Sequence, residues 1–255
     1  MRPRNLTIAV FVLWTAARLC AAQEITVAAA ADLQFAFQDV AARFEKNTGK
    51  HIKLIFGSSG NFFVQIQNGA PFDVFFSADI DYPKRLEAAA LAEPGTLYPY
   101  ATGRIVLWAR NDSKLDLSRG LQVLLDPSIQ KIAIANPGHA PYGRAAVAAL
   151  KHENIYDKVA PRFVLGENIS QAASFVVSGS ADIGIVALSL ALAPSLKEKG
   201  RYVEIPAADY PAIEQAAVIL KSSSSKETAS QFVSFLKTPE IQSLLRSYGF
   251  SVPSS

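Results

Sequence analysis

The sequence predicts an α/β fold with mostly parallel sheets. Short apolar runs recur along the chain, and helical stretches of similar length separate them. Half of the 255 residues are hydrophobic and 18% are charged, so the chain can bury a sizeable core. Strands that alternate with helices in this way are typical of βαβ units.

The first third of the chain indicates three strands, each followed by a helix. The strands are expected at Glu24–Ala30, His51–Phe56 and Asp73–Phe76. Apolar residues at helical spacing predict the helices at 32–47, which stops at Gly49, at Phe62–Asn68 and at Pro83–Ala90. The apolar run Asp73–Phe76 is typical of a buried parallel strand, and its phenylalanines fit core packing.

The remaining chain continues the alternation. Further strands are expected at Arg104–Ala109, Lys131–Ala135, Ile183–Val186 and Gln215–Lys221. Helices are expected at Gly143–His152, Ser170–Ser178, Lys226–Lys237 and Pro239–Tyr248. We also expect Trp108, inside one of these strands, to pack in the core.

Residues 1–22 are predicted to be an export signal. Arg2 and Arg4 precede a mostly apolar run of about twelve residues, and Cys20-Ala21-Ala22 offers small residues before a cleavage site near Ala22. An uncut membrane anchor is the alternative, but the run is short for ~30 Å of hydrocarbon. A lipoprotein modified at Cys20 is a weaker alternative, because Leu19 stands where a small residue is needed. We expect the mature protein to be periplasmic.

Charge and cysteine usage exclude several classes of protein. The net charge of +3 comes entirely from Arg2, Arg4 and Arg18, so residues 23–255 carry 22 basic and 22 acidic residues. A neutral chain lacks the electrostatic footprint of a nucleic-acid-binding protein. The single Cys excludes a disulfide framework, and three His leave little for a histidine metal site.

Small donor residues gather where strands end and helices begin. Four loops share this character: 29–32, 57–61, 136–143 and 166–169. Ligands of open α/β sheets bind beyond the carboxyl ends of strands, and the N–H groups of helix N-termini favour anions. Ordinary helix capping explains any one of these loops, but four of them favour an oxyanion site. None contains Lys, which indicates neutral donors.

Motifs for nucleotide binding, for a nucleophile elbow and for a zinc protease are missing. A secreted serine hydrolase that uses Ser58 or Ser59 with His139 as base remains a distant alternative. Asp79 and Asp81 are more simply a solvated helix start than acid–base partners. We therefore expect a protein that is not an enzyme and has no cofactor.

The motifs resemble those of the periplasmic molybdate-binding proteins of ABC transporters. The matching segments are ITVAAAADL, FGSSGNFFVQIQNGAPFDVFFSAD, ANPGHAPYGRAA, GSADIGIV and RSYGF, which span almost all of residues 24–252. The resemblance implies a type II two-lobed fold, whose lobes close on an oxyanion and are joined by two crossing strands near 103–108 and 213–220. It divides the chain into a signal peptide (1–22), lobe 1 (23–103 and 214–255) and lobe 2 (104–213).

The resemblance also implies the site residues. Carried over by position, the oxyanion ligands are Ala31, Asp32, Ser59, Tyr142 and Ile169, so molybdenum is bound only as molybdate. Asp32 departs from the family, which often has serine here. Because a carboxylate repels a dianion, we expect its side chain to cap a helix while its N–H serves the ligand. The family often has tyrosine where this chain has Ala187, and Tyr142 is expected to supply the missing phenol.

The function implied is capture of molybdate, and of tungstate, for a membrane permease of an ABC importer. The same fold with another tetrahedral oxyanion, such as sulfate, is the alternative. We expect a monomer whose only other partner is the permease, contacted transiently, with no nucleic acid.

Overall fold

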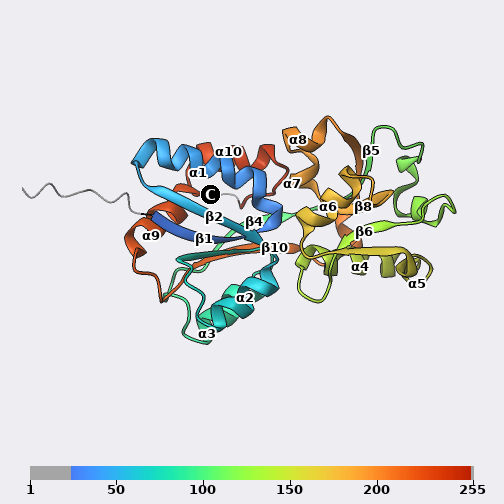
Figure 1. Cartoon of the computed structure of the whole chain (residues 1–255). Coiled ribbons are helices and arrows are strands. Elements are labelled where there is room, and N and C mark those ends of the chain that lie inside the picture. Colours follow the sequence, from blue (N-terminus) through green and yellow to red (C-terminus); the bar gives the residue numbers. More distant parts are fainter. Residues whose placement is uncertain (1–23, 254–255) are drawn as a thin grey trace, which may run out of the picture.

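The computed structural model describes residues 24–253, and the predicted signal segment lies outside them. Two α/β lobes are built around two five-stranded sheets (Figure 1). The first sheet has the order β2-β1-β3-β10-β4 and the second the order β7-β6-β8-β5-β9. The first sheet comprises β1 (Glu24–Ala30), β2 (His51–Gly57), β3 (Val74–Ser77), β4 (Tyr98–Gly103) and β10 (Ile213–Ile219). The second comprises β5 (Ile105–Arg110), β6 (Ile132–Ala135), β7 (Phe163–Gly166), β8 (Ile183–Ala187) and β9 (Gly200–Glu204).

In each sheet four strands run in one direction and one runs against them. β1 pairs in parallel with β2 and β3, whereas β10 is antiparallel to β3 and β4. In the second sheet β6 is parallel to β7 and β8, and β5 is antiparallel to β8 and β9. Only Arg104 separates β4 from β5, so the chain passes straight from one sheet into the other. The carboxyl ends of the parallel strands of each lobe therefore face the other lobe.

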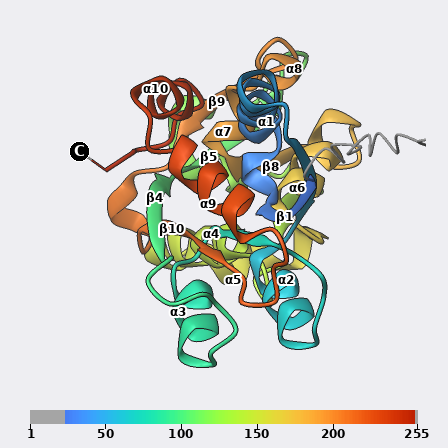
Figure 2. The ribbon, with the colours of Figure 1, turned by 90° about the vertical axis from the view of Figure 1, so that its left-hand side faces the viewer.

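Helices cover both faces of the first sheet. On one face lie α1 (Gln34–Thr48), α9 (Lys226–Phe235) and α10 (Pro239–Ser247), and on the other α2 (Ser59–Gln67) and α3 (Asp81–Ala88) (Figure 2). Successive residues of β3 serve the two faces: Phe76 packs with Phe37 and Phe232, and Phe75 packs with Phe62. This explains why the strand is apolar throughout. The lobe therefore takes helices from both ends of the chain.

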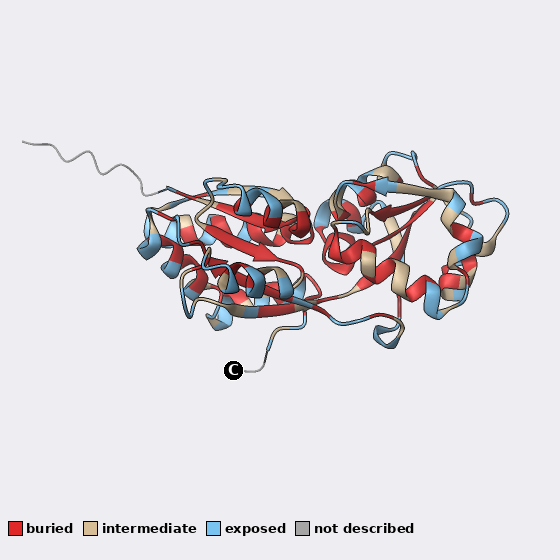
Figure 3. Cartoon of the chain, turned by 90° about the horizontal axis from the view of Figure 1, so that it is seen from below, coloured by how far each residue is buried: buried red, intermediate tan, exposed pale blue. Residues whose placement is uncertain are grey.

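The second lobe has a continuous core that extends to Ala30, Ala31 and Ala78 of the first lobe, and Trp108 is fully buried in it. Figure 3 shows the buried strands of both lobes. Its helices are α4 (Pro141–His152), α5 (Tyr156–Val159), α6 (Ile169–Val177), α7 (Leu188–Ala191) and α8 (Pro194–Lys197). Four 3-10 segments complete the described chain: η1 (Ala31–Leu33), η2 (Leu117–Leu125), η3 (Ala160–Arg162) and η4 (Ala207–Asp209). Within residues 24–253 we find no helix with the length and hydrophobicity of a membrane span.

Among the predicted helix starts that the structure moves, two bear on the strand-end loops. α2 begins at Ser59 rather than Phe62, because the Ser58 side chain caps it by accepting the Asn61 N–H. α4 begins at Pro141 rather than Gly143, because proline at the first helical position needs no N–H partner. Both shifts bring the start of a helix to a strand-end loop. They place Ser59 and Tyr142 in first turns.

Candidate oxyanion-binding site

A small cavity of about 10 Å³ lies between the lobes, where the strand-end loops meet. Both lobes line it, through Ala30, Ala31, Asp32, Gly57, Ser58, Ser59, Ala78, Ala140, Pro141, Tyr142, Asn168 and Ile169. The five residues predicted to hold the ligand are all among them, and neither Lys nor Arg is. The structure thus brings these residues together, while their contact with a ligand stays a prediction.

The starts of four helical segments border the cavity. They are η1, which continues directly into α1, together with α2, α4 and α6. Ala31, Ser59 and Ile169 are the first residues of η1, α2 and α6. N–H groups of a first turn have no partner within their own helix. Two helical segments from each lobe therefore bring free donors and positive dipole ends to one small space.

Ser59 has a fully buried side chain at this cavity. Its Oγ accepts the backbone N–H of Ala78 at 2.9 Å. A hydroxyl that accepts one bond keeps its own hydrogen to donate. The Ala78 contact therefore orients Ser59 as a donor, the role expected from the sequence.

The lobes touch directly beside the cavity. Ser58 Oγ lies 2.8 Å from Nδ1 of His139, and the Gly60 N–H donates to the His139 carbonyl at 3.0 Å. A Cβ at Gly60 would lie 2.5 Å from that carbonyl oxygen, so only glycine permits this approach. Asn61 also donates to Glu167, and Arg144 pairs with Asp79. The described structure is therefore a closed arrangement of the two lobes.

Asp32 behaves differently from its sequence-based expectation. Its side chain is 1% exposed, and no side-chain cap is formed at the start of η1 or α1. Instead, Oδ2 accepts the hydroxyl of Tyr142 at 2.9 Å and Nε2 of Gln215 at 2.7 Å. Oδ1 has no hydrogen-bond partner within residues 24–253. The capping prediction is wrong because a buried carboxylate finds stronger donors in the other lobe and in β10.

Burial raises the pKa of Asp32 to about 6, against the opposing effect of the hydrogen bonds from Gln215 and Tyr142. Burial, followed by the negative charge of Asp32, also raises the pKa of Tyr142 well above its ordinary value. The phenol is therefore a neutral donor at physiological pH. Its single proton is directed at Asp32, so the notion that it replaces a phenol missing at Ala187 stays a prediction.

No motif of the sequence predicts the polar cluster around Asp32. Gln215 is fully buried in β10, and its Oε1 accepts the hydroxyl of Tyr100 at 2.7 Å. Ser189 donates to the backbone carbonyl of Asp32 at 2.7 Å. A Cβ at Gly103 would collide with the Tyr142 hydroxyl, so this glycine makes room for the cluster. A glutamine inside an apolar strand is the one signal that pointed to Gln215.

Asp79 and Asp81 form a helix start, as predicted. α3 begins at Asp81, whose N–H donates to Oδ1 of Asp79 at 2.9 Å. A larger hollow of about 380 Å³ opens here, bordered by Asp79, Lys84, Arg144 and Glu214. Its mixed charges favour no single class of ligand.

One group of possible metal ligands occurs in the described chain, formed by His152, Glu153 and Asp209, with ligand atoms within 4.8 Å of one another. It lies outside the cavity, and surface groups of this kind are common without a metal. His152 and Asp209 are 3.3 Å apart, which is an ordinary surface pair.

Comparisons with known proteins agree with this architecture. Residues 25–251 match the family model described as bacterial extracellular solute-binding protein. The chain is 37% identical to the molybdate-binding protein ModA of Rhodobacter capsulatus over 90% of this chain and 89% of that protein. It is 30% identical to ModA of Escherichia coli, with 90% and 89% covered. The solved periplasmic molybdate-binding protein of Azotobacter vinelandii matches with a TM-score of 0.85, 37% identity, and 90% and 100% of the two chains covered.

Proposed function

The chain belongs to the family of bacterial extracellular solute-binding proteins, and from this premise we propose that it captures molybdate. One observation carries the proposal. Four helical N-termini and the Ser59 hydroxyl converge on a small cavity whose described lining includes neither Lys nor Arg. The chain is 37% identical to molybdate-binding proteins over about 90% of its length. Neutral dipoles suit a dianion that must be both bound tightly and released.

The site residues in this proposal are Ala31, Asp32, Ser59, Tyr142 and Ile169. Backbone N–H groups of the first turns surround the anion, and the Ser59 hydroxyl adds a donor from lobe 1. All donors belong to the protein, so the proposal needs no resident cofactor. Molybdenum enters as the centre of the oxyanion.

Tungstate is the second ligand that we propose, because it shares the charge and tetrahedral shape of molybdate. Sulfate has the same charge and geometry but is smaller, and it is the alternative ligand. Hydrogen-bond donors discriminate poorly among these anions, so the size of the closed cavity determines which of them binds most tightly.

Delivery to a membrane permease follows from the same proposal. We propose that residues 1–22 direct export and are removed near Ala22, and that the mature monomer works in the periplasm. Closure of the lobes over the anion would present one closed surface to the permease. The contacts of His139 with Ser58 and Gly60 would form during that closure.

Native mass spectrometry and calorimetry test the ligand directly. Protein freed of bound anion is titrated with molybdate, tungstate and sulfate at one pH and ionic strength. We expect one molybdate or one tungstate per chain, and sulfate at least tenfold weaker. Tight sulfate binding with no uptake of molybdate would overturn the assignment.

The pairing of Ser58 with His139 is the one observation that favours a hydrolase. The nearest carboxylate to the second ring nitrogen is that of Glu167 at 4.0 Å, beyond hydrogen-bond distance. Ser58 also caps α2, and we therefore assign the pair to lobe contact. We expect no labelling of Ser58 by a fluorophosphonate probe, and covalent labelling there would support the hydrolase.

A further inference from the structure

We propose that Asp32 binds the oxyanion as a neutral carboxylic acid, so that the protein takes up one proton with each anion and releases it again on unloading. This inference rests on the proposed function and adds a proton to it. The proton sits on Oδ1 of Asp32 and is donated to an oxygen of the anion. Oδ2 then acts as the carbonyl oxygen of the acid.

The two oxygens of Asp32 have different surroundings. Oδ2 accepts two hydrogen bonds, from the Tyr142 hydroxyl at 2.9 Å and from Gln215 Nε2 at 2.7 Å. Oδ1 is buried and has no partner in the described part of the chain. Asp32 lines the cavity between the lobes. A neutral acid with its hydrogen on Oδ1 would use every polar atom of the group once the anion is present.

The partners of Oδ2 are fixed as donors. The Tyr100 hydroxyl donates to Oε1 of Gln215, so Nε2 of the same amide faces Asp32. Nε2 also donates to the Tyr142 oxygen at 3.0 Å, which leaves the Tyr142 hydrogen for Asp32. These directions make Oδ2 an acceptor only, and they leave Oδ1 as the place for the proton.

Within residues 24–253, the elements packed against Asp32 bring no cation to its carboxyl group. The groups that face it are Tyr142 of α4, Tyr100 of β4, Gln215 of β10 and Ser189 of α7, which contacts its backbone carbonyl. The two phenols stay protonated because burial raises their pKa values well above the ordinary value. An ionised Asp32 would therefore meet a dianion with nothing between them, in a poorly hydrated space. Protonation removes that repulsion and supplies a donor.

The proton is readily available. Burial raises the pKa of Asp32 to about 6, so about one chain in ten carries the proton at pH 7. Apparent affinity falls by the fraction that is competent to bind, which is about tenfold at pH 7. A nearby dianion raises the pKa of the acid further, and the bound complex therefore holds the proton through neutral pH.

An anion that brings its own proton is the competing arrangement. Hydrogen phosphate could donate to an ionised Asp32, and the carboxylate would then select for phosphate. In that case the anion, rather than Asp32, would donate the hydrogen bond between them, and the preferred ligand would be phosphate rather than molybdate. The choice of anion in the experiment separates the two cases.

The test is calorimetric titration of the full mature chain with molybdate at pH 5.5, 6.5, 7.5 and 8.5. Each titration is repeated in two buffers of different ionisation enthalpy, which gives the number of protons taken up. We expect a Kd that changes little below pH 6 and rises toward tenfold per pH unit above it, with close to one proton taken up at pH 8.5. Asp32→Asn presents an amide in place of the acid, and we expect its Kd to lose this slope and its proton uptake to vanish.

A wild-type Kd that is flat across this range, with no proton uptake, overturns the inference while the proposed function stands. The same holds if Asp32→Asn keeps the slope, or if phosphate binds wild type more tightly than molybdate does. Failure of molybdate to bind at every pH overturns the proposed function as well. The proton count on wild type needs no variant, so the test survives if Asp32→Asn does not fold.

Discussion

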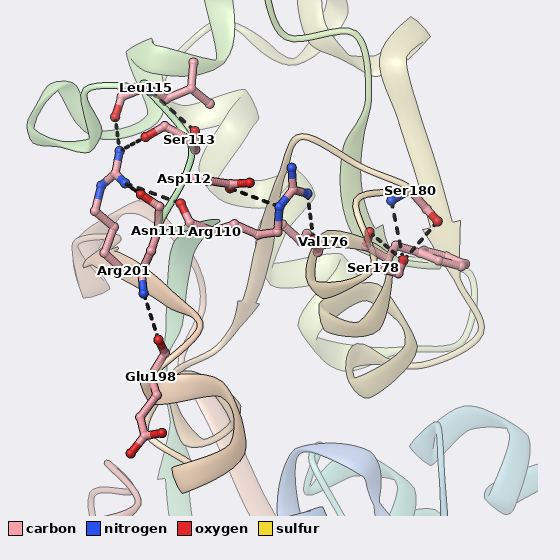
Figure 4. A network of polar contacts seen from close by, with 11 residues as sticks. Arg110, Asn111, Asp112, Ser113, Leu115, Val176, Ser178, Ser180, Glu198 and Arg201 are labelled. Atoms are coloured by element: carbon pink, nitrogen blue, oxygen red, sulfur yellow. Dashed lines mark hydrogen bonds and ion pairs between the residues drawn. The ribbon is translucent and has the colours of Figure 1, made fainter.

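Two polar clusters of this protein differ in whether all their polar atoms have hydrogen-bond partners. At the outer end of lobe 2, Arg201 donates to four backbone carbonyls, and Arg110 pairs with Asp112 at 3.2 Å (Figure 4). Between the lobes, the partners of Asp32 within residues 24–253 are all neutral, and one of its oxygens has no partner there. Among the described residues, the inner cluster therefore leaves a buried side-chain oxygen unpaired, and the outer cluster leaves none.

This difference indicates that the outer cluster stabilises the fold and the inner cluster binds a ligand. A half-exposed guanidinium that meets several carbonyls ties a loop to a strand, and water can replace part of what is lost. A fully buried carboxyl with a free oxygen lowers stability unless something pairs with it. Natural chains keep such groups mainly where a ligand completes them. The inner cluster is therefore the part of the molecule shaped for binding.

The largest effect that we expect is in the pH dependence of folding. Because the pKa of Asp32 is raised from 3.8 to about 6, the folded state binds the proton more tightly than the unfolded state. The contribution of this group to stability is therefore greatest below pH 4 and falls as the pH rises through 6, by about 3 kcal/mol in all. Urea unfolding of wild type and Asp32→Asn from pH 4.5 to 7.5 measures this change. A constant difference between the two proteins would contradict it.

Carboxylates of lobe 2 near the outer cluster should respond in the opposite direction. The hydrogen bonds from Ser118 and Ser128 lower the pKa values of Asp116 and Asp126. Their contribution is present at neutral pH and is lost as the pH falls through their folded-state pKa values. The stability of wild type contains both pH dependences, and the comparison with Asp32→Asn isolates the part that comes from Asp32.

Ser59→Ala should give the next largest effect, and on affinity rather than on folding. Loss of one hydrogen bond to a charged ligand weakens binding by about 1.5–3 kcal/mol, or ten- to a hundredfold. Ser178→Ala is the matched control, because Ser178 pairs with Ser180 at the outer end of lobe 2 (Figure 4). Calorimetry with molybdate should show a weaker Kd for Ser59→Ala alone. Equal affinity of both variants would remove Ser59 from the site.

How far the sequence predicts the fold depends on where a strand lies in its sheet. The strands β4, β7 and β9 are not among the predicted strands, and all three are edge strands. The fourth edge strand, β2, is predicted because its sequence HIKLIF is largely apolar. An edge strand is less covered, so its sequence need not be an apolar run: β9 reads GRYVE and β4 contains Pro99. The interior strands were all predicted, because burial on both faces demands a continuous apolar run.

The site divides in the same way. Ser59, Tyr142 and Ile169 stand in local motifs, a strand end followed by a helix start, and local motifs are readable. The contact of Asp32 with Gln215 joins residues 183 positions apart, which no local pattern reveals. The wrong capping prediction for Asp32 followed from this, since its true partners come from the other lobe and from the returning strand.

Tyr142→Phe should weaken molybdate binding more than Asp32→Asn does. Loss of the hydroxyl removes a donor to Oδ2 of Asp32, so the acid is held by Gln215 alone among the partners found in the described chain. A single bond of this kind is worth about 1.5 kcal/mol, or about tenfold in Kd. Asparagine in place of Asp32 can still accept from Tyr142 and Gln215. Titration of both variants at pH 5.5, where Asp32 is largely protonated with or without the Tyr142 hydroxyl, gives the ranking, and the reverse order would show that the carboxyl matters more than the phenol.

Arg201→Ala should have the smallest effect. It tests whether the outer cluster of lobe 2 contributes to stability alone and not to ligand binding. Arg201 donates to the carbonyls of Arg110, Asn111, Ser113 and Leu115, at 2.6–3.4 Å. These carbonyls lie near the surface, so water can take over part of the lost bonding. We expect a loss of about 1 kcal/mol in the free energy of unfolding and no change in the Kd for molybdate. The reason is distance: Arg201 lies in β9, at the end of the lobe that faces away from the cavity, and none of its partners lines the cavity. If Arg201→Ala weakens binding as much as Ser59→Ala does, the two clusters are energetically coupled, and the division between a complete structural cluster and an incomplete binding cluster is wrong.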